Sequence, residues 1–161
     1  MEIISRWLAD FSLGQSRLVP SMATISSAKA TLRIMGDSLI PEEVTSLLGA
    51  TPTKAQRKGQ ELRGSSGTSL TAKFGMWRLQ AAETTPGDLD AQVQEILAQL
   101  SDDIAVWNRL ASQFDIDLYC GWFMEKENEG LGVTAATLRE LGARSIELSL
   151  DIYSGDAKDR E

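Results

Sequence analysis

AKATLRIM, the stretch at residues 28–35, decides how this chain folds. Leu32 and Ile34 alternate there with Thr31 and Arg33. Because successive side chains of a β-strand point to opposite faces, this spacing makes one face apolar and the other partly polar. The stretch therefore predicts a strand that buries one face and leaves the other face against water.

Three further stretches show the same alternation and predict strands that join the first one in a sheet. They are residues 72–82, which contain GMWRLQAA, residues 115–126, DIDLYCGWFMEK, and residues 146–153, IELSLDIY. A short strand at residues 54–58 would be a fifth member, whereas the rest of residues 54–71 is rich in Gly and Ser and predicts loop. The sheet is therefore expected to have four to five strands.

Helical patterns separate these strands. Residues 41–49, PEEVTSLLG, start with proline and two acids and end with glycine, which is typical of a short helix. Residues 88–114 carry apolar side chains at three- and four-residue steps, but an unbroken helix of that length would measure about 40 Å. Because that exceeds a ten-residue strand, we expect a kink or restart at residues 101–103, Ser-Asp-Asp. A third helix is predicted to begin after Thr134, to run through Leu141 and to be closed by Gly142.

The order of these elements predicts an α+β fold. Strands and helices do not repeat as strict βαβ units, so we expect a two-layer sandwich with an antiparallel or mixed sheet and helices mainly on one face. A chain of 161 residues buries roughly 70% of its unfolded surface in one domain. We assign this domain to residues 27–154, an N-terminal extension or linker to residues 1–26, and a frayed tail to residues 155–161.

Composition removes several kinds of chemistry. The chain has no histidine, which excludes Ser-His and Cys-His nucleophiles and histidine metal sites. It has one cysteine, Cys120, so neither an intramolecular disulfide nor a multi-cysteine metal site can form. Cys120 falls on the apolar face of its strand and is interpreted as a buried, inert thiol. We therefore expect no cofactor, no metal and no catalytic residue.

Charge and hydropathy restrict the location and the partners. No stretch approaches 18 consecutive apolar residues, so no membrane span is expected. The first twenty residues lack the apolar core of a signal peptide, which together with the free thiol favours the cytoplasm. The net charge of −7 argues against general nucleic-acid binding.

Several of these stretches carry a family resemblance. LRIMGDSLIPEEVTSLLGATPT at residues 32–53, KGQ at 58–60 and KFGMWRL at 73–79 resemble the bacterial family known as domain of unknown function 4279. The resemblance covers residues 28–153 and leaves residues 1–26 outside. It implies a small bacterial cytosolic α+β domain without established enzyme activity, in a family some of whose members are regarded as immunity proteins beside toxin genes.

The first candidate site is a basic segment at residues 54–78, in which six basic residues stand against the single acid Glu61. Its candidate binding residues are Arg57, Lys58, Gly59, Arg63, Lys73 and Arg78. Cations and glycine N–H groups in such a segment could approach an anion, although the Walker phosphate-loop pattern is absent. The alternative is a solvated loop that pairs with carboxylates of its own chain.

The second candidate site lies on the polar faces of the last two predicted strands. It consists of Asp117 and Tyr119 on one strand and Asp151 and Tyr153 on the other. Two converging aspartates suit acid–base chemistry. The alternative is the wet face of a half-exposed sheet, with its aspartates paired to arginines on neighbouring strands.

These observations favour a non-enzymatic binding protein, an immunity or inhibitor-like module that engages another protein. The alternative is a binder of small anionic ligands, or an enzyme, that uses the basic segment 54–78. A homo-oligomer is a third interpretation for which the sequence offers no discriminating feature.

Overall fold

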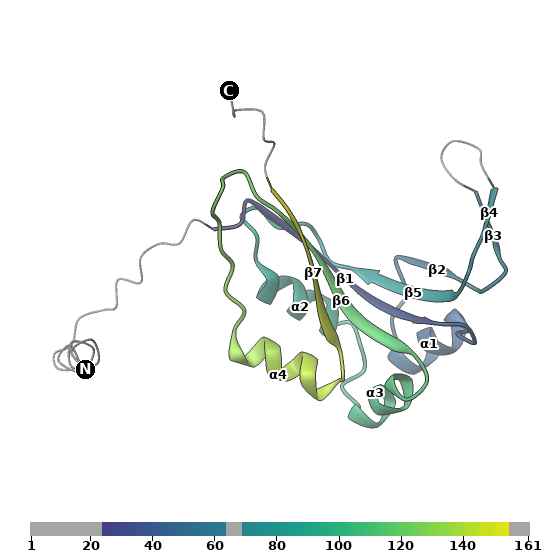
Figure 1. The fold of residues 1–161 in the computed structure, drawn as a ribbon. Coiled ribbons are helices and arrows are strands. Elements are labelled where there is room, and N and C mark those ends of the chain that lie inside the picture. The colour runs from purple at the N-terminus through teal and green to yellow at the C-terminus, as the bar shows by residue number, and fades with distance from the viewer. Residues whose placement is uncertain (1–23, 64–68, 155–161) are drawn as a thin grey trace, which may run out of the picture.

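The protein folds around one five-stranded mixed sheet with the strand order β2-β5-β1-β6-β7 (Figure 1). The structure is a computed structural model that describes residues 24–63 and 69–154. The strands of this sheet are β1 (Ser27–Gly36), β2 (Lys54–Gln56), β5 (Gly75–Gln80), β6 (Asp115–Phe123) and β7 (Glu147–Tyr153). The central strand β1 runs antiparallel to β5 and β6, and β2 runs antiparallel to β5, whereas β7 runs parallel to β6. The predicted strands are therefore present, in one sheet.

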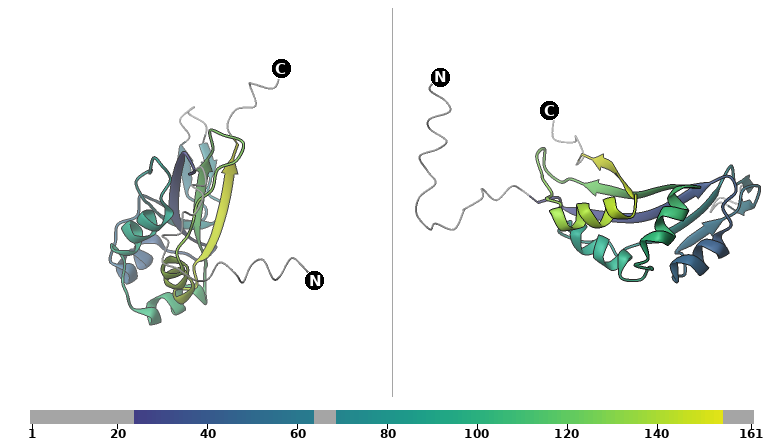
Figure 2. Two further views of the ribbon diagram at one scale, coloured as in Figure 1. Left: turned by 90° about the vertical axis from the view of Figure 1, so that its left-hand side faces the viewer. Right: turned by 90° about the horizontal axis from the view of Figure 1, so that it is seen from below.

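Four helices cover one face of this sheet. They are α1 (Pro41–Leu48), α2 (Leu89–Leu97), α3 (Ile104–Ala111) and α4 (Ala135–Ala143). Helix α1 packs on β5, α2 on β1, α3 on β6 and α4 on β7. The right-hand view of Figure 2 shows all four helices on the same side of the strands. The predicted α+β sandwich with helices on one face is confirmed, and its sheet is of the mixed kind.

The helix boundaries follow from capping residues. Asp88 caps α2 by accepting a hydrogen bond from the backbone of Ala91, and Asp103 caps α3 by accepting one from Ala105, both at 2.9 Å. The restart expected at residues 101–103 is thus confirmed, because a free carboxylate there satisfies the first N–H groups of a new helix. The predicted end of the last helix at Leu141 is wrong by two residues, since α4 continues through Gly142 to Ala143.

One element contradicts the sequence prediction. Residues 54–71 were expected to be mostly loop, but β3 (Glu61–Arg63) and β4 (Ser69–Thr71) form a separate antiparallel hairpin that projects beyond the sheet (Figure 1). These strands are three residues long and bury no face, and Leu70 opposite Leu62 is 64% exposed. Without a buried face there is no alternation to read, which explains why the sequence pattern misses them.

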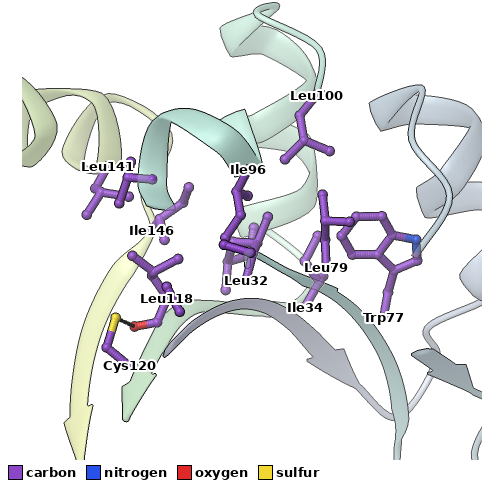
Figure 3. Close-up of a cluster of buried hydrophobic side chains, with 14 of the residues drawn as sticks. Leu32, Ile34, Trp77, Leu79, Ile96, Leu100, Leu118, Cys120, Leu141 and Ile146 are labelled. Atoms are coloured by element: carbon purple, nitrogen blue, oxygen red, sulfur yellow. Dashed lines mark hydrogen bonds between the residues drawn. The ribbon is translucent and has the colours of Figure 1, made fainter. Parts of the chain in front are cut away.

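The hydrophobic core fills the space between the helices and the sheet (Figure 3). Leu32, Trp77 and Leu118 enter it from three neighbouring strands, and Ile96 enters it from α2. These four side chains are at most 1% exposed. The indole nitrogen of Trp77 donates to the Thr45 hydroxyl at 3.0 Å, so this large ring is buried without an unpaired donor.

The described chain enters the core before β1 begins. Ile25 is 2% exposed and packs in the core, although it belongs to the extension expected at residues 1–26. Its backbone also donates a hydrogen bond to the carbonyl of Gly130 at 3.1 Å. The rest of the expected extension, residues 1–23, and the expected tail, residues 155–161, lie outside the described residues.

Candidate functional site

The face of the sheet opposite the helices is here called the open face, since no helix lies against it in residues 24–63 and 69–154 (Figure 2). Strand alternation and pairing place the following residues on it: Lys54, Gln56, Met76, Arg78, Gln80, Lys29, Thr31, Arg33, Met35, Asp117, Tyr119, Gly121, Phe123, Glu147, Ser149, Asp151 and Tyr153. Five of the ten candidate residues therefore lie on the open face, namely all four residues of the second candidate site and Arg78 of the first.

A row of charged residues crosses all five strands of the open face. The paired positions, in order from β2 to β7, are Lys54, Arg78, Arg33, Asp117 and Glu147. Neighbouring strands lie about 4.8 Å apart, so each residue has the next one directly beside it. The row has three positive charges over β2, β5 and β1 and two negative charges over β6 and β7. The two halves of the open face therefore carry charge of opposite sign.

The positive and negative halves meet at an ion pair. Arg33 donates from Nε to Oδ1 of Asp117 at 2.8 Å, and a second guanidinium nitrogen contacts Oδ2. The same guanidinium lies 4.3 Å from the ring centroid of Tyr119, a cation–π geometry. The hydrogen bond that Arg33 donates to Asp117 raises the pKa of Arg33. Arg33 is therefore held in one orientation by two neighbours on β6, the cross-strand pairing expected for Asp117.

A second network joins the tyrosines to Asp151. The hydroxyls of Tyr119 and Tyr153 both donate to Oδ2 of Asp151 at 2.5 Å. These bonds lower the pKa of Asp151, and the bond to Asp151 raises the pKa of Tyr119 and of Tyr153. The Tyr153 ring also stacks on Phe123 with centroids 4.9 Å apart. The four residues of the second candidate site are thus brought together, but Asp151 lies beside Gly121 and not beside Asp117.

The open face contains a hollow of about 240 Å³. Its lining residues are Lys29, Thr31, Arg33, Arg78, Gln80, Tyr119, Gly121, Phe123 and Tyr153. Thr31 and Gly121 are the smallest of these residues, and they lie two pairs apart in the register of β1 and β6. The longer side chains around them form the walls. The rings of Phe123 and Tyr153 lie against Gly121, so the hollow remains where the short Thr31 is surrounded by longer side chains.

The basic segment does not form one site. Arg57 pairs with Glu42 at 2.7 Å and Lys58 pairs with Asp37, so both bind acids of their own chain near α1. Arg63 is exposed on β3 and Lys73 is exposed before β5, whereas Arg78 lies on the open face. Gly59 has a φ of 81° at the turn after β2. A more open hollow of about 560 Å³ lies there, lined by Pro41, Glu42 and residues 55–60.

Sequence reasoning missed Lys29, Arg33, Gln80 and Phe123 as site residues. The alternation in the stretch at residues 28–35 assigns Arg33 to the polar face, which is the signal that was available. Only the pairing of β1 with both β5 and β6 brings these residues together. Cys120 lies on the covered face, where burial raises its pKa to about 12. Its thiol is thus the unreactive neutral form at neutral pH.

The fold and the site define an α+β sandwich whose sheet has one face covered by helices and one polarised, partly aromatic face available for contact. The chain belongs to the family described as Domain of unknown function (DUF4279), whose model matches residues 26–155. No curated protein and no solved structure was found to match it. None of the described helices has the length and apolar character needed to cross a membrane.

Proposed function

We propose that this protein is a non-enzymatic binding module that engages a partner protein through the open face of its sheet. The observation that carries the proposal is the exposed ring pair of Phe123 and Tyr153, which lies on the open face six residues along β6 and β7 from the charge row. Phe123 is 40% exposed and Tyr153 is 46% exposed, although they are stacked on each other. Aromatic side chains in this position are the residues that most often supply binding energy at protein interfaces.

The charge row supports specificity for one orientation of the partner. Positive charge lies over β2, β5 and β1, and negative charge lies over β6 and β7. A partner with the complementary distribution is attracted in one orientation and repelled in the reverse one. The carboxylates that could do acid–base chemistry are engaged already, Asp117 by Arg33 and Asp151 by two tyrosines. This arrangement supports binding better than catalysis.

The partner is tested by affinity capture with matched variants. Phe123→Ala with Tyr153→Ala removes the exposed ring pair, and Ile104→Ala with Leu138→Ala removes two exposed apolar side chains from the helices. A protein captured by the wild type should be lost with the first double variant and retained with the second. The interaction is then titrated with purified partner. Loss with the helix variant and retention with the ring variant would assign the interface to the covered side of the molecule.

We further propose that the partner is a toxin and that the chain is a bacterial, cytoplasmic immunity protein. The family resemblance and the net charge of −7 support this, because acidic inhibitors attract basic toxins such as nucleases. A toxin gene beside the gene for this chain is the first thing to look for. Coexpression should then relieve its toxicity with the wild type and fail to do so with the ring variant. Equal relief by both would separate the immunity role from the open face.

A further inference from the structure

The hollow on the open face receives more positive charge than the carboxylates around it neutralise. Lys29 and Arg78 line the hollow, and neither forms an ion pair with any residue in the described ranges. Arg33 lines it as well, but Asp117 neutralises that charge. Two cations without an ion-pair partner among the described residues, Lys29 and Arg78, therefore line one small hollow.

The position of Arg78 is unfavourable for the sheet alone. Its paired neighbours are Arg33 on one side and Lys54 on the other, so three like charges stand in adjacent positions. Like charges placed directly opposite each other destabilise a sheet. A local arrangement that opposes stability without a visible compensation is typical of a functional site, where a bound group supplies the compensation.

We propose that this hollow binds a small molecule that carries a phosphomonoester group. Such a group has a charge of about −1.5 to −2 at neutral pH, which matches the two unneutralised charges of Lys29 and Arg78. A guanidinium can donate two parallel hydrogen bonds to phosphate oxygens. Arg33 is already oriented by Asp117 and Tyr119, so one wall of the site is preorganised.

Neutral donors complete the site. The Thr31 hydroxyl and the Gln80 amide line the hollow, and neither side chain has a hydrogen-bond partner among the described residues. Asp117 and Asp151 lie on the β6 and β7 side, where they repel an anion. The phosphate therefore belongs on the side of β1 and β5, above Thr31.

The far end of the hollow defines the organic part of the ligand. Phe123 and Tyr153 line that end, and their stacked rings present an apolar surface. A planar ring can lie against this surface while its phosphate reaches Lys29 and Arg78. The structure therefore points to aromatic phosphomonoesters. The inference goes beyond the proposed function, because a ligand in the hollow neither requires nor excludes a partner protein.

The test is calorimetric titration with phenyl phosphate at low ionic strength. The wild type is compared with Lys29→Gln/Arg78→Gln and with Arg57→Gln/Lys58→Gln, a control that removes the same charge from exposed ion pairs outside the hollow. Affinity should fall at least tenfold in the first variant and at most about twofold in the control. Circular dichroism and the unfolding midpoint of each variant establish that the fold is retained.

Three further probes separate the parts of the inference. Benzoate has the ring with a single negative charge and should bind at least tenfold more weakly, and equal binding would overturn the dianion. Inorganic phosphate should bind more weakly than phenyl phosphate, and equal binding would overturn the role of the ring pair. A short single-stranded RNA that binds more tightly than phenyl phosphate would overturn the small-molecule assignment. Equal loss of affinity in both variants would overturn the assignment of the site to the hollow. The absence of any binding heat at millimolar phenyl phosphate would overturn the proposal as a whole. These results leave the protein partner to be judged by its own capture experiment.

Discussion

The two faces of the sheet are built from the same strands but are held together by different interactions. On the covered face, side chains such as Leu32 and Leu118 are at most 1% exposed and are held by apolar packing. On the open face, Arg33, Asp117 and Tyr119 are held by directed hydrogen bonds and charge. Alternation along each strand therefore separates apolar packing on one face from polar and charged contacts on the other, and a substitution at one position alters one of the two faces.

The largest change in the free energy of unfolding is expected when a large buried side chain is removed from the covered side of the sheet. Trp107 of α3 is 0% exposed, and its indole nitrogen donates to the carbonyl of Ser101 at 2.8 Å. Trp107→Ala should lower the free energy of unfolding by about 3–5 kcal/mol, because it removes a large buried ring and leaves a cavity. Phe123→Ala on the open face should stay within about 1 kcal/mol of wild type. Denaturant unfolding followed by circular dichroism measures the free energy of unfolding of both variants. A loss below about 1 kcal/mol for Trp107→Ala would contradict the assignment of stability to the covered face.

A smaller change in the free energy of unfolding is expected when the ion pair between Arg33 and Asp117 on the open face is removed. Arg33→Ala removes two contacts to Asp117 and the cation over Tyr119. The side chain of Asp117 is 13% exposed, so its unpaired carboxylate would lose bonds that water replaces only in part. We expect a loss of about 1–2 kcal/mol in denaturant unfolding, below that of a fully buried pair. No measurable loss would show that the ion pair does not stabilise the fold.

The tyrosine network gives an optical test of the open face. The chain has two tyrosines, Tyr119 and Tyr153, and both donate to Asp151. Because these bonds raise both tyrosine pKa values, the network stabilises the fold fully below the unfolded tyrosine pKa of about 10 and loses this contribution as pH rises through the folded values. The lowered pKa of Asp151 gives stability that is present above about pH 4 and is lost on acidification.

Ultraviolet absorbance of tyrosinate reports the ionisation of Tyr119 and Tyr153 directly. In the wild type, tyrosinate should form above its ordinary pH range, and Asp151→Ala should return it toward a pKa of about 10. Ser149→Ala, on the same face of β7, is a control that should leave the titration unchanged. Identical titration curves for wild type and Asp151→Ala would show that these hydrogen bonds are absent in solution.

The smallest effect should have the opposite sign. Arg78→Ala relieves repulsion from Lys54 and Arg33 and breaks no ion pair among the described residues, so it should raise the free energy of unfolding by a few tenths of a kcal/mol. Arg57→Ala with Lys58→Ala instead breaks two exposed pairs and should lower it by no more than roughly 1 kcal/mol. Both are read from denaturant unfolding at low salt. A clear loss of stability in Arg78→Ala would make that residue structural.

Local patterns predicted the parts of the fold that bury a face. The alternation around Leu32 and the apolar steps of residues 88–114 each depend on neighbours in sequence, and both are confirmed. The hairpin around Leu62 has no buried face and was missed. The site needed more than local pattern, because the row from Lys54 to Glu147 exists only once the strand order is known.

The position of β1 in the chain has a consequence during synthesis. It is the first strand of the sheet along the chain and also its centre, and Arg33 waits 84 residues for its partner Asp117. At roughly 5–20 residues per second, that interval is about 4–17 s on the ribosome. During this interval β1 can already pair with β5 and pack against α2, because both precede β6 in the chain, but the other edge of β1 has no partner strand. The sheet is therefore completed late, and a nascent chain that pauses before β6 exposes an unpaired edge of its central strand.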